Sequence, residues 1–327
     1  MPKLRAPRPH RPGRPSRRAA NGVARIVVLG DLMLDVVLAP GGPLERGTDV
    51  PGRVSFVQGG SAANTARWLA RLGARTTLIA AVGRDPAGRA LVDAVREDRV
   101  QARVMRVAGA RTGRIGVLLG SDGERSFVAD RGAADLLTAA DVQAAWFSRA
   151  DALHVPAYSL LNEPLGIAGR RAVSLARDAG AVVSVDLASI GPLLAQGRRP
   201  ARALIEDVAP DLLFATAAEA EALLGRNAVE GLLELAPTAV VKRGSKGATV
   251  LARAGEERLR FEVATEHITV KDTTGAGDAF DAGFLVGWLT ARSAGRSLPA
   301  SLQRAALAGH RAAARQLSTP RPELPIA

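Results

Sequence analysis

Short, almost entirely apolar runs alternate with longer, alanine-rich stretches from residue 24 onward. An uninterrupted apolar run that is rich in β-branched residues and bounded by turns is typical of a parallel strand covered on both faces. The sequence therefore predicts buried strands at residues 25–30, 76–83, 151–158, 181–187, 211–217 and 238–244.

The stretches between these runs have helical spacing, with apolar residues recurring every three or four positions. Helices are predicted at 61–73, 86–98, 138–149, 163–179, 200–208, 217–224, 228–236, 276–291 and 299–317. Regular alternation of strands and helices indicates an α/β fold, in which a central, mostly parallel, doubly wound sheet is flanked by helices.

Two regions interrupt this alternation. Residues 36–57 and 101–130 contain strand-like pieces with alternating polarity and glycine-rich turns, and no helix. We interpret them as a small β-sheet lid that rises from the main body. Open parallel sheets bind ligands at the carboxyl ends of their strands, so such a lid would cover a site there.

The composition excludes several kinds of site. The chain has 327 residues, 47% of them hydrophobic and 3% aromatic, so a sizeable core must be built from aliphatic side chains. The absence of cysteine excludes disulfides, thiolate metal sites and a cysteine nucleophile. The four histidines lack the spacing of zinc ligands. No run reaches the ~18 apolar residues of a membrane span, and we expect a cytoplasmic protein.

The formal net charge of +12 is carried by the two ends of the chain. Residues 1–20 contain seven basic residues and no acidic one, and residues 292–327 contain six arginines and one glutamate. An Arg/Pro-rich segment cannot bury apolar area, so residues 1–22 are predicted to be a disordered tail. We expect one folded domain over 23–318 and a C-terminal tail over 319–327. A neutral body with few aromatic residues argues against nucleic acid as a partner.

The segment DTTGAGDAF, residues 272–280, carries the strongest chemical signal. Gly275, Ala276 and Gly277 are small and precede an apolar helical run, so backbone N–H groups at the start of that helix can approach an anion closely. Asp278 would lie in the first turn, where a carboxylate can take the proton of a hydroxyl that attacks a bound phosphate. A glycine-rich turn capped by an aspartate is the alternative.

The segment QGGSAAN, residues 58–64, is the second candidate. Gly59 and Gly60 precede a predicted helix, and Asn64 would lie one turn into it. Backbone and amide groups here could bind substrate hydroxyls. Alone, the pattern fits equally well a simple glycine turn followed by a solvent-facing asparagine.

Together the two segments resemble the two signature regions of the PfkB, or ribokinase-like, carbohydrate kinases. GGSAAN is similar to the substrate loop of that family, and DTTGAGDAF is similar to its D-T-x-G-A-G-D motif, in the same order along residues 24–317. The resemblance implies an α/β sheet with a small β lid, the last aspartate of the motif as the base, and ATP with Mg²⁺ as the usual phosphoryl donor.

The resemblance implies a role for each matching position. Asp278 matches the base, and residues 275–277 match the hole that binds the transferred phosphoryl group. The matching substrate contacts are Asp35, Gly59, Gly60 and Asn64; the matching nucleotide positions are Lys242, Gly244, Gly247 and Thr274; the matching metal positions are Glu219 and, for a monovalent cation such as K⁺, Asp272.

The chain also departs from the family pattern. Thr216 replaces the asparagine of the N-x-x-E motif, and only Asp186 remains of a D-x-N-x-R motif. Ser61 and Met33 replace a lysine and an asparagine that are usual near the substrate. The resemblance therefore implies an intact base and anion hole, with altered binding of the metal.

These observations predict an ATP-dependent kinase that phosphorylates a hydroxyl of a small sugar or sugar derivative. A nucleoside kinase on the same fold is an alternative, because the apolar Met33 would suit a substrate that carries a base. A non-catalytic ligand-binding regulator is a second alternative, which the altered metal motifs favour. A nucleic-acid binder that acts through the Arg-rich tail is a third. A homodimer joined through the lid would match the family.

Overall fold

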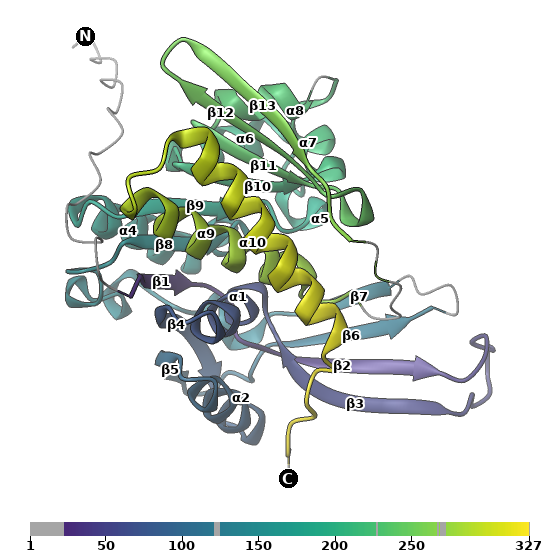
Figure 1. Cartoon of the computed structure of the whole chain (residues 1–327). Helices are drawn as coiled ribbons and strands as arrows, with labels where there is room; N and C mark the ends of the chain where they lie inside the picture. The colour runs from purple at the N-terminus through teal and green to yellow at the C-terminus, as the bar shows by residue number, and fades with distance from the viewer. Residues whose placement is uncertain (1–22, 121–124, 227, 267, 269–272, 327) are drawn as a thin grey trace, which may run out of the picture.

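A computed structural model describes residues 23–120, 125–226, 228–266, 268 and 273–326. A large sheet lies between two layers of helices, and a smaller sheet projects from one side of this body (Figure 1). The chain therefore has the α/β architecture with a separate small sheet that the sequence predicts.

The large sheet contains nine strands in the order β13-β12-β11-β10-β9-β8-β1-β4-β5. All neighbours from β11 to β5 pair in parallel, and β12 and β13 add an antiparallel edge. The bounds are β1 Arg25–Leu29, β4 Arg75–Gly83, β5 Gln101–Val107, β8 Ala152–Pro156, β9 Val182–Asp186, β10 Leu212–Thr216, β11 Thr238–Lys242, β12 Ala248–Ala254 and β13 Glu257–Val263. The six buried strands expected from the apolar runs are all present.

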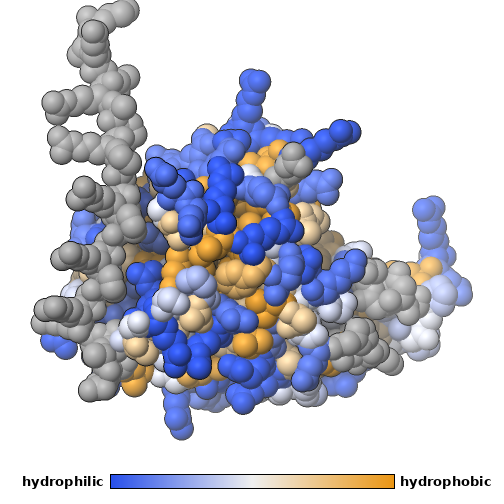
Figure 2. Space-filling view, turned by 45° about the horizontal axis from the view of Figure 1, so that its top comes forward, coloured by the Kyte–Doolittle hydropathy of each residue, from blue (hydrophilic) through white to orange (hydrophobic). Residues whose placement is uncertain are grey.

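Helices cover both faces of the large sheet. One hydrophobic core forms beneath α1, α2, α9 and α10, and a second forms on the opposite face beneath α4, α6 and α7. The bounds are α1 Ser61–Arg71, α2 Pro86–Glu97, α3 Tyr158–Leu161, α4 Leu165–Asp178, α5 Ile190–Leu193, α6 Arg198–Val208, α7 Ala217–Leu224, α8 Ala228–Gly231, α9 Ala276–Ser293 and α10 Leu298–Ser318. Hydrophilic residues surround an apolar area on the face shown in Figure 2.

The small sheet has the order β3-β2-β6-β7 and is the lid. Its strands are β2 Met33–Pro40, β3 Gly52–Gly59, β6 Arg114–Leu119 and β7 Arg125–Asp130. β2 starts directly beyond the carboxyl end of β1, and β3 leads through Gly60 into α1. The lid therefore grows out of the edge of the large sheet at which parallel strands end.

Three local predictions are wrong. Residues 101–107 form β5 at the edge of the large sheet, not part of the lid; their alternating polarity reflects an edge strand with one exposed face. Residues 138–149 form two 3₁₀ turns instead of a helix, because Val142 and Gln143 have extended backbones between them. Residues 228–236 contain only the single turn α8 and a 3₁₀ turn, and the hairpin β12–β13 was not foreseen.

The C-terminal segment, residues 319–326, lies along the lid. The backbone N–H of Leu324 donates a 2.8 Å hydrogen bond to the carbonyl of Phe56, and Glu323 forms an isolated bridge with Val57 on the edge strand β3. Leu324 is buried in the core beneath the helices. The segment thus ties the lid to the body. No helix in the described part of the chain is long and apolar enough to cross a membrane.

Candidate active site

The segment predicted to bind phosphate lies at the start of α9. Gly275 precedes this 18-residue helix with a φ of 77°, a left-handed conformation that favours glycine. No side chain among the described residues caps this helix end, and the positive end of the helix dipole faces the loop before it. The anion hole at Gly275, Ala276 and Gly277 stays a prediction; the Ala276 N–H donates a 3.3 Å hydrogen bond to the carbonyl of Thr273.

Asp278 lies in the first turn of α9 beside this hole. Its carboxylate accepts hydrogen bonds from Ser61 Oγ at 2.7 Å and from Asn64 Nδ2 at 2.9 Å, both on α1. Burial raises the pKa of Asp278 to about 6, although these two hydrogen bonds oppose the shift. A carboxylate with such a pKa is a capable proton acceptor near neutral pH. The structure thus brings together two residues that the sequence assigned separately, Asp278 and Asn64.

A buried lysine lies beneath the anion hole. Lys242, at the end of β11, places Nζ 3.1 Å from Asp186 Oδ1 and 3.1 Å from Asp281 Oδ2. A methyl group built on Gly277 would lie 3.4 Å from the same Nζ. Burial lowers the pKa of Lys242, but the two carboxylates outweigh this effect and the net shift is upward. The site therefore contains a permanent positive charge next to the start of α9.

Glu219, the predicted metal residue, is the third residue of α7. Its Oε2 accepts a 2.7 Å hydrogen bond from the backbone N–H of Thr216, and Thr216 Oγ1 accepts one from the Glu219 N–H. Thr216, which replaces the asparagine of the family motif, thus caps the start of α7 in a reciprocal capping box with Glu219. Burial and then repulsion from Asp186 raise the pKa of Glu219.

The described residues contain no group of three or more acidic or histidine side chains that could hold a metal ion alone. Glu219 and Asp186 offer carboxylates on one side of the site, which suits Mg²⁺, an ion that usually binds through one or two carboxylates, water and substrate phosphates. Asp272, the other predicted metal position, lies outside the described residues.

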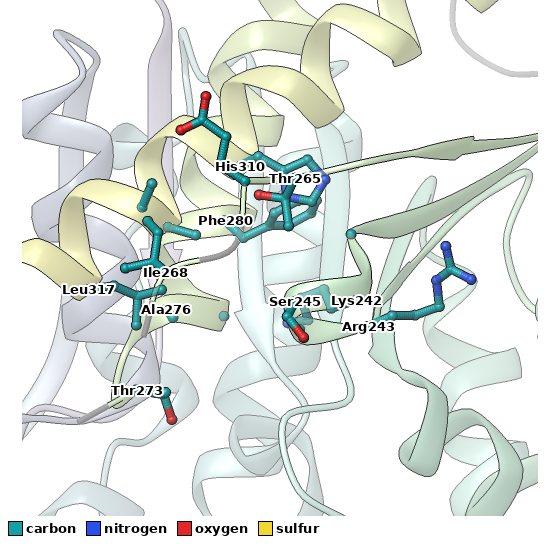
Figure 3. Close-up of a pocket in the computed structure, with 16 residues that line it drawn as sticks. Lys242, Arg243, Ser245, Thr265, Ile268, Thr273, Ala276, Phe280, His310 and Leu317 are labelled. Atoms are coloured by element: carbon teal, nitrogen blue, oxygen red, sulfur yellow. The ribbon is translucent and has the colours of Figure 1, made fainter. Parts of the chain in front are cut away.

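A cavity of about 410 Å³ adjoins the anion hole, a size that suits a nucleotide. It lies between the β11–β12 turn and the C-terminal half of α10 (Figure 3). Gly244 and Gly247 of that turn line it, as does Lys242, whereas Thr274 lies in the neighbouring loop. Its apolar wall is formed mainly by Ile268, Ala276, Phe280, Ala313 and Leu317.

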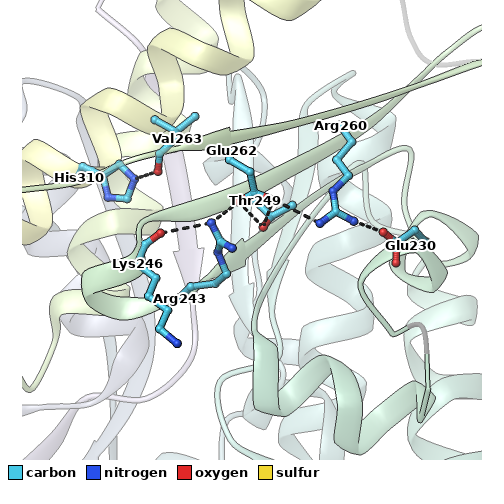
Figure 4. Close-up of polar contacts among 8 residues, drawn as sticks. All are labelled: Glu230, Arg243, Lys246, Thr249, Arg260, Glu262, Val263 and His310. Atoms are coloured by element: carbon cyan, nitrogen blue, oxygen red, sulfur yellow. Dashed lines mark hydrogen bonds and ion pairs between the residues drawn. The ribbon is translucent and has the colours of Figure 1, made fainter.

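Two polar side chains that line this cavity, Arg243 and His310, have partners outside it. Arg243 turns away from the cavity (Figure 3) and forms an ion pair with Glu262, which also pairs with Arg260 (Figure 4). His310 Nε2 lies 3.1 Å from the carbonyl of Val263; because a carbonyl only accepts, Nε2 carries the proton. The cavity wall is thus largely apolar, as expected for the base of a nucleotide.

The predicted sugar-binding residues lie at the base of the lid. Asp35 on β2 is 4% exposed, and a methyl group on Gly59 would overlap its carboxylate. Gly60 has a φ of 95°, and any side chain there would strike the Asp31 carbonyl. Asp35 Oδ2 accepts a 2.6 Å hydrogen bond from Nη1 of Arg321, which the C-terminal segment brings to the site. The sequence analysis did not foresee this ion pair.

Three further side chains near the site were not assigned from the sequence. Arg131 lies 3.7 Å from the buried Asp31 and 5.2 Å from the centre of the Tyr158 ring. Burial raises the pKa of Tyr158 to about 12, so its hydroxyl stays protonated. Arg125, at the start of the lid strand β7, donates hydrogen bonds to the hydroxyls of Thr273 and Thr274. In the sequence, Asp31 directly after the first strand was the signal that could have drawn attention to this part of the site.

Known proteins are similar to this chain over most of its length. A family model described as "pfkB family carbohydrate kinase" matches residues 23–324. Fructokinase-1 of Oryza sativa subsp. japonica is 34% identical over 268 residues, which are 78% of this chain and 80% of that protein.

Two solved structures show the same fold. The adenosine kinase from Sinorhizobium meliloti matches with a TM-score of 0.77 at 25% identity, covering 92% of this chain and 96% of that one. The fructokinase from Vibrio cholerae O395, in its fructose, ADP and calcium ion bound form, matches with a TM-score of 0.74 at 24% identity, covering 91% and 94%.

Proposed function

This chain belongs to the pfkB family of carbohydrate kinases and is an ATP-dependent phosphotransferase that acts on a sugar hydroxyl, and we propose that its acceptor is a neutral hexose of the fructose type. The observation that carries the proposal is Asp278, a carboxylate with a raised pKa that two side chains of α1 hold beside a helix N-terminus. In this assignment Asp278 accepts the proton of the attacking hydroxyl while the 275–277 backbone binds the transferred group.

The nucleotide is proposed to lie with its base in the apolar cavity and its phosphates toward α9. Gly244, Gly247 and Thr274 border the path between these two points, and Lys242 supplies positive charge below the anion hole. Bound Mg²⁺ would supply electrostatic stabilisation of the phosphates, with Glu219 and Asp186 as its nearest protein groups. The Vibrio cholerae fructokinase, which shares this fold, binds ADP and a calcium ion, and this supports the use of a nucleotide and a divalent cation. We also assign Asp272 to a monovalent-cation site, as the family resemblance implies.

The sugar is proposed to lie between Asp35, the Gly59–Gly60 backbone, Asn64 and Asp278. Arg321 and Arg131, the cations at this end, are each paired with a carboxylate, Asp35 and Asp31 respectively. Paired arginines offer a negatively charged substituent much less attraction than unpaired ones. A neutral sugar therefore fits this end of the site better than a sugar phosphate or a sugar acid.

A nucleoside kinase remains the second candidate, since the adenosine kinase from Sinorhizobium meliloti matches this fold over 92% of the chain. An assay of ADP release over a panel of fructose, other hexoses, pentoses, sugar phosphates and nucleosides separates the two. We expect the highest kcat/KM with a free ketohexose, and a kcat that is ~10²–10⁴-fold lower for Asp278→Asn. Preferential turnover of adenosine, or of a sugar phosphate, would replace the hexose assignment.

A homodimer joined through the lid is a further proposal. Large apolar side chains are exposed on the lid, with Val54 at 58%, Phe127 at 56% and Val128 at 77%. Exposed apolar groups of this kind commonly mark protein interfaces. Light scattering of the purified chain should give twice the monomer mass, and Val128→Asp should return it to the monomer mass.

A further inference from the structure

A second large cavity lies at the opposite end of the sheet from the catalytic residues. It measures about 500 Å³ and adjoins the amino ends of the parallel strands β1, β4 and β5. Five arginines line it, together with Trp146 from a 3₁₀ turn: Arg25, Arg75, Arg99, Arg103 and Arg149. We call this cavity the arginine pocket. Since the site described above lies at the carboxyl ends of the strands, the two cavities are separated by the length of the sheet.

The charge of the arginine pocket is not balanced locally. None of its lining residues is acidic, and no carboxylate within the described residues forms an ion pair with any of the five guanidinium groups. Asp151, which is close in sequence, accepts a hydrogen bond from the backbone N–H of Arg25. Five like charges around one cavity repel each other, and a bound anion would relieve that repulsion.

Arg99 adopts a backbone conformation that favours glycine. It follows the C-cap of α2 with a φ of 62°, and Arg99 and Val100 close the helix with the same pair of backbone hydrogen bonds seen at three other helix ends. At those three ends the equivalent residue is Gly73, Gly180 or Gly295. An arginine in a conformation that favours glycine prompts the hypothesis that its side chain has a function of its own.

Arg103 packs against an aromatic ring of the arginine pocket. Its guanidinium carbon lies 5.6 Å from the centre of the Trp146 ring, and its buried Nε has no hydrogen-bond partner within the described residues. An arginine packed against an aromatic ring keeps its N–H groups directed outward in the plane of the guanidinium, the geometry that binds phosphate oxygens. A buried donor without a partner is costly, so an anion at this position would be favoured.

We propose that the arginine pocket binds a small oligophosphate, such as the di- or triphosphate group of a metabolite. Five arginines from different segments around one cavity supply several forked donors, which suit an anion with closely spaced phosphates better than a single carboxylate. The volume is also sufficient for such a ligand. This site is independent of the catalytic residues and of the sugar that they phosphorylate.

The test is calorimetric titration of inorganic triphosphate into the full chain and three variants at fixed ionic strength. Arg99→Gly and Arg149→Ala should each weaken binding about tenfold, the loss expected for one charged hydrogen bond. Arg258→Ala, which removes an exposed arginine from β13, is the charge-matched control and should leave the affinity unchanged.

Arg99→Gly also separates function from folding. Glycine accepts the left-handed backbone, so the variant should melt at a temperature no lower than the wild type and should phosphorylate sugar at the wild-type rate. Loss of triphosphate binding with normal melting and turnover would support the arginine pocket. Equal triphosphate binding by Arg99→Gly and the wild type would overturn it.

Two further measurements test whether the ligand binds in the pocket and whether that ligand is a small molecule or a nucleic acid. Deletion of residues 1–20 removes seven basic residues and should leave triphosphate binding unchanged; if binding is lost, the tail and not the pocket is the ligand site. A short DNA duplex should bind more weakly than triphosphate, and Arg99→Gly should leave the affinity for the duplex unchanged. Tight duplex binding that depends on Arg99 would replace the small-molecule assignment with a nucleic-acid surface.

Discussion

The proposed phosphate end of the active site comes largely from one contiguous segment, residues 273–281, whereas the proposed sugar end is assembled from parts of the chain as distant as Asp35 and Arg321. At the phosphate end, a glycine turn and the start of a helix supply backbone N–H donors, and these groups belong to adjacent residues. At the sugar end, buried ion pairs determine which groups a substrate meets. We infer that the first arrangement serves the phosphoryl transfer and that the second selects the substrate.

The largest effect is expected from Asp278→Asn. Removing a positioned base typically costs ~10²–10⁴-fold in kcat, and the amide keeps the size of the side chain. Steady-state ADP release measures the loss. A variant that retained near wild-type turnover with its best sugar would show that the base is another residue.

Asp278→Asn should lower the activity but raise the stability of the folded protein. Because the folded-state pKa of Asp278 is raised to about 6, its contribution to stability is present while the group is protonated and is lost as the pH rises through about 6. Asp278→Asn stays neutral at every pH. Its melting temperature should therefore exceed that of the wild type by more at pH 8 than at pH 5, as thermal unfolding can show.

Lys242→Met tests how much the buried lysine near the start of α9 contributes to the stability of the fold. The substitution leaves Asp186 and Asp281 buried without their shared cation, a change that typically costs about 3–5 kcal/mol. Urea unfolding measures the loss. Lys246→Met, on the exposed neighbouring turn, is the matched control and should change the free energy of unfolding little. Equal stabilities of the two variants would remove the structural role assigned to Lys242.

Arg321→Ala tests the sugar end alone. Loss of a charged hydrogen bond to Asp35 should raise the KM for the sugar about tenfold, while the KM for ATP and kcat change much less. Glu323→Ala removes only the exposed ion pair with Arg53 in the same segment and should have nearly no effect. If both variants raise both KM values alike, the C-terminal segment acts on general folding and not on the sugar.

Ser61→Ala should give the smallest effect. Its hydroxyl lowers the pKa of Asp278 by a hydrogen bond, so its removal should shift the acidic limb of the kcat/KM profile to higher pH. Turnover at pH 8, where the base is ionised in both proteins, should change little. A profile that coincides with the wild type would show that this hydrogen bond is not made in solution.

The difference between the two ends also explains what could be predicted from the sequence. Gly275 to Asp278 and Gly59 to Asn64 could be assigned because backbone approach and a nearby carboxylate need only neighbouring residues. The pair Asp35–Arg321 could not, since the tail residue gives no sign of its partner 286 positions away. The arginine pocket escaped notice for a related reason: the neutral total charge of residues 21–291 conceals arginines that only the fold brings together.

The same distinction holds for the fold. The buried parallel strands were predicted because both of their faces are covered, which gives each an unbroken apolar run. β5 was misassigned because an edge strand has the same alternating pattern as a lid strand. The helix expected at 138–149 is absent because the extended backbones of Val142 and Gln143, which the apolar pattern does not report, separate two short turns.

The central claim is that Asp278, with its raised pKa, is the base for phosphorylation of a sugar hydroxyl. The most direct test is kcat/KM for the best sugar between pH 5 and pH 8. The base must be ionised to act, so the rate should be level above pH 7 and should fall toward tenfold per pH unit below about pH 6. The residual activity of Asp278→Asn should lack this limb. A wild-type profile that is flat from pH 5 to pH 8 would contradict the account.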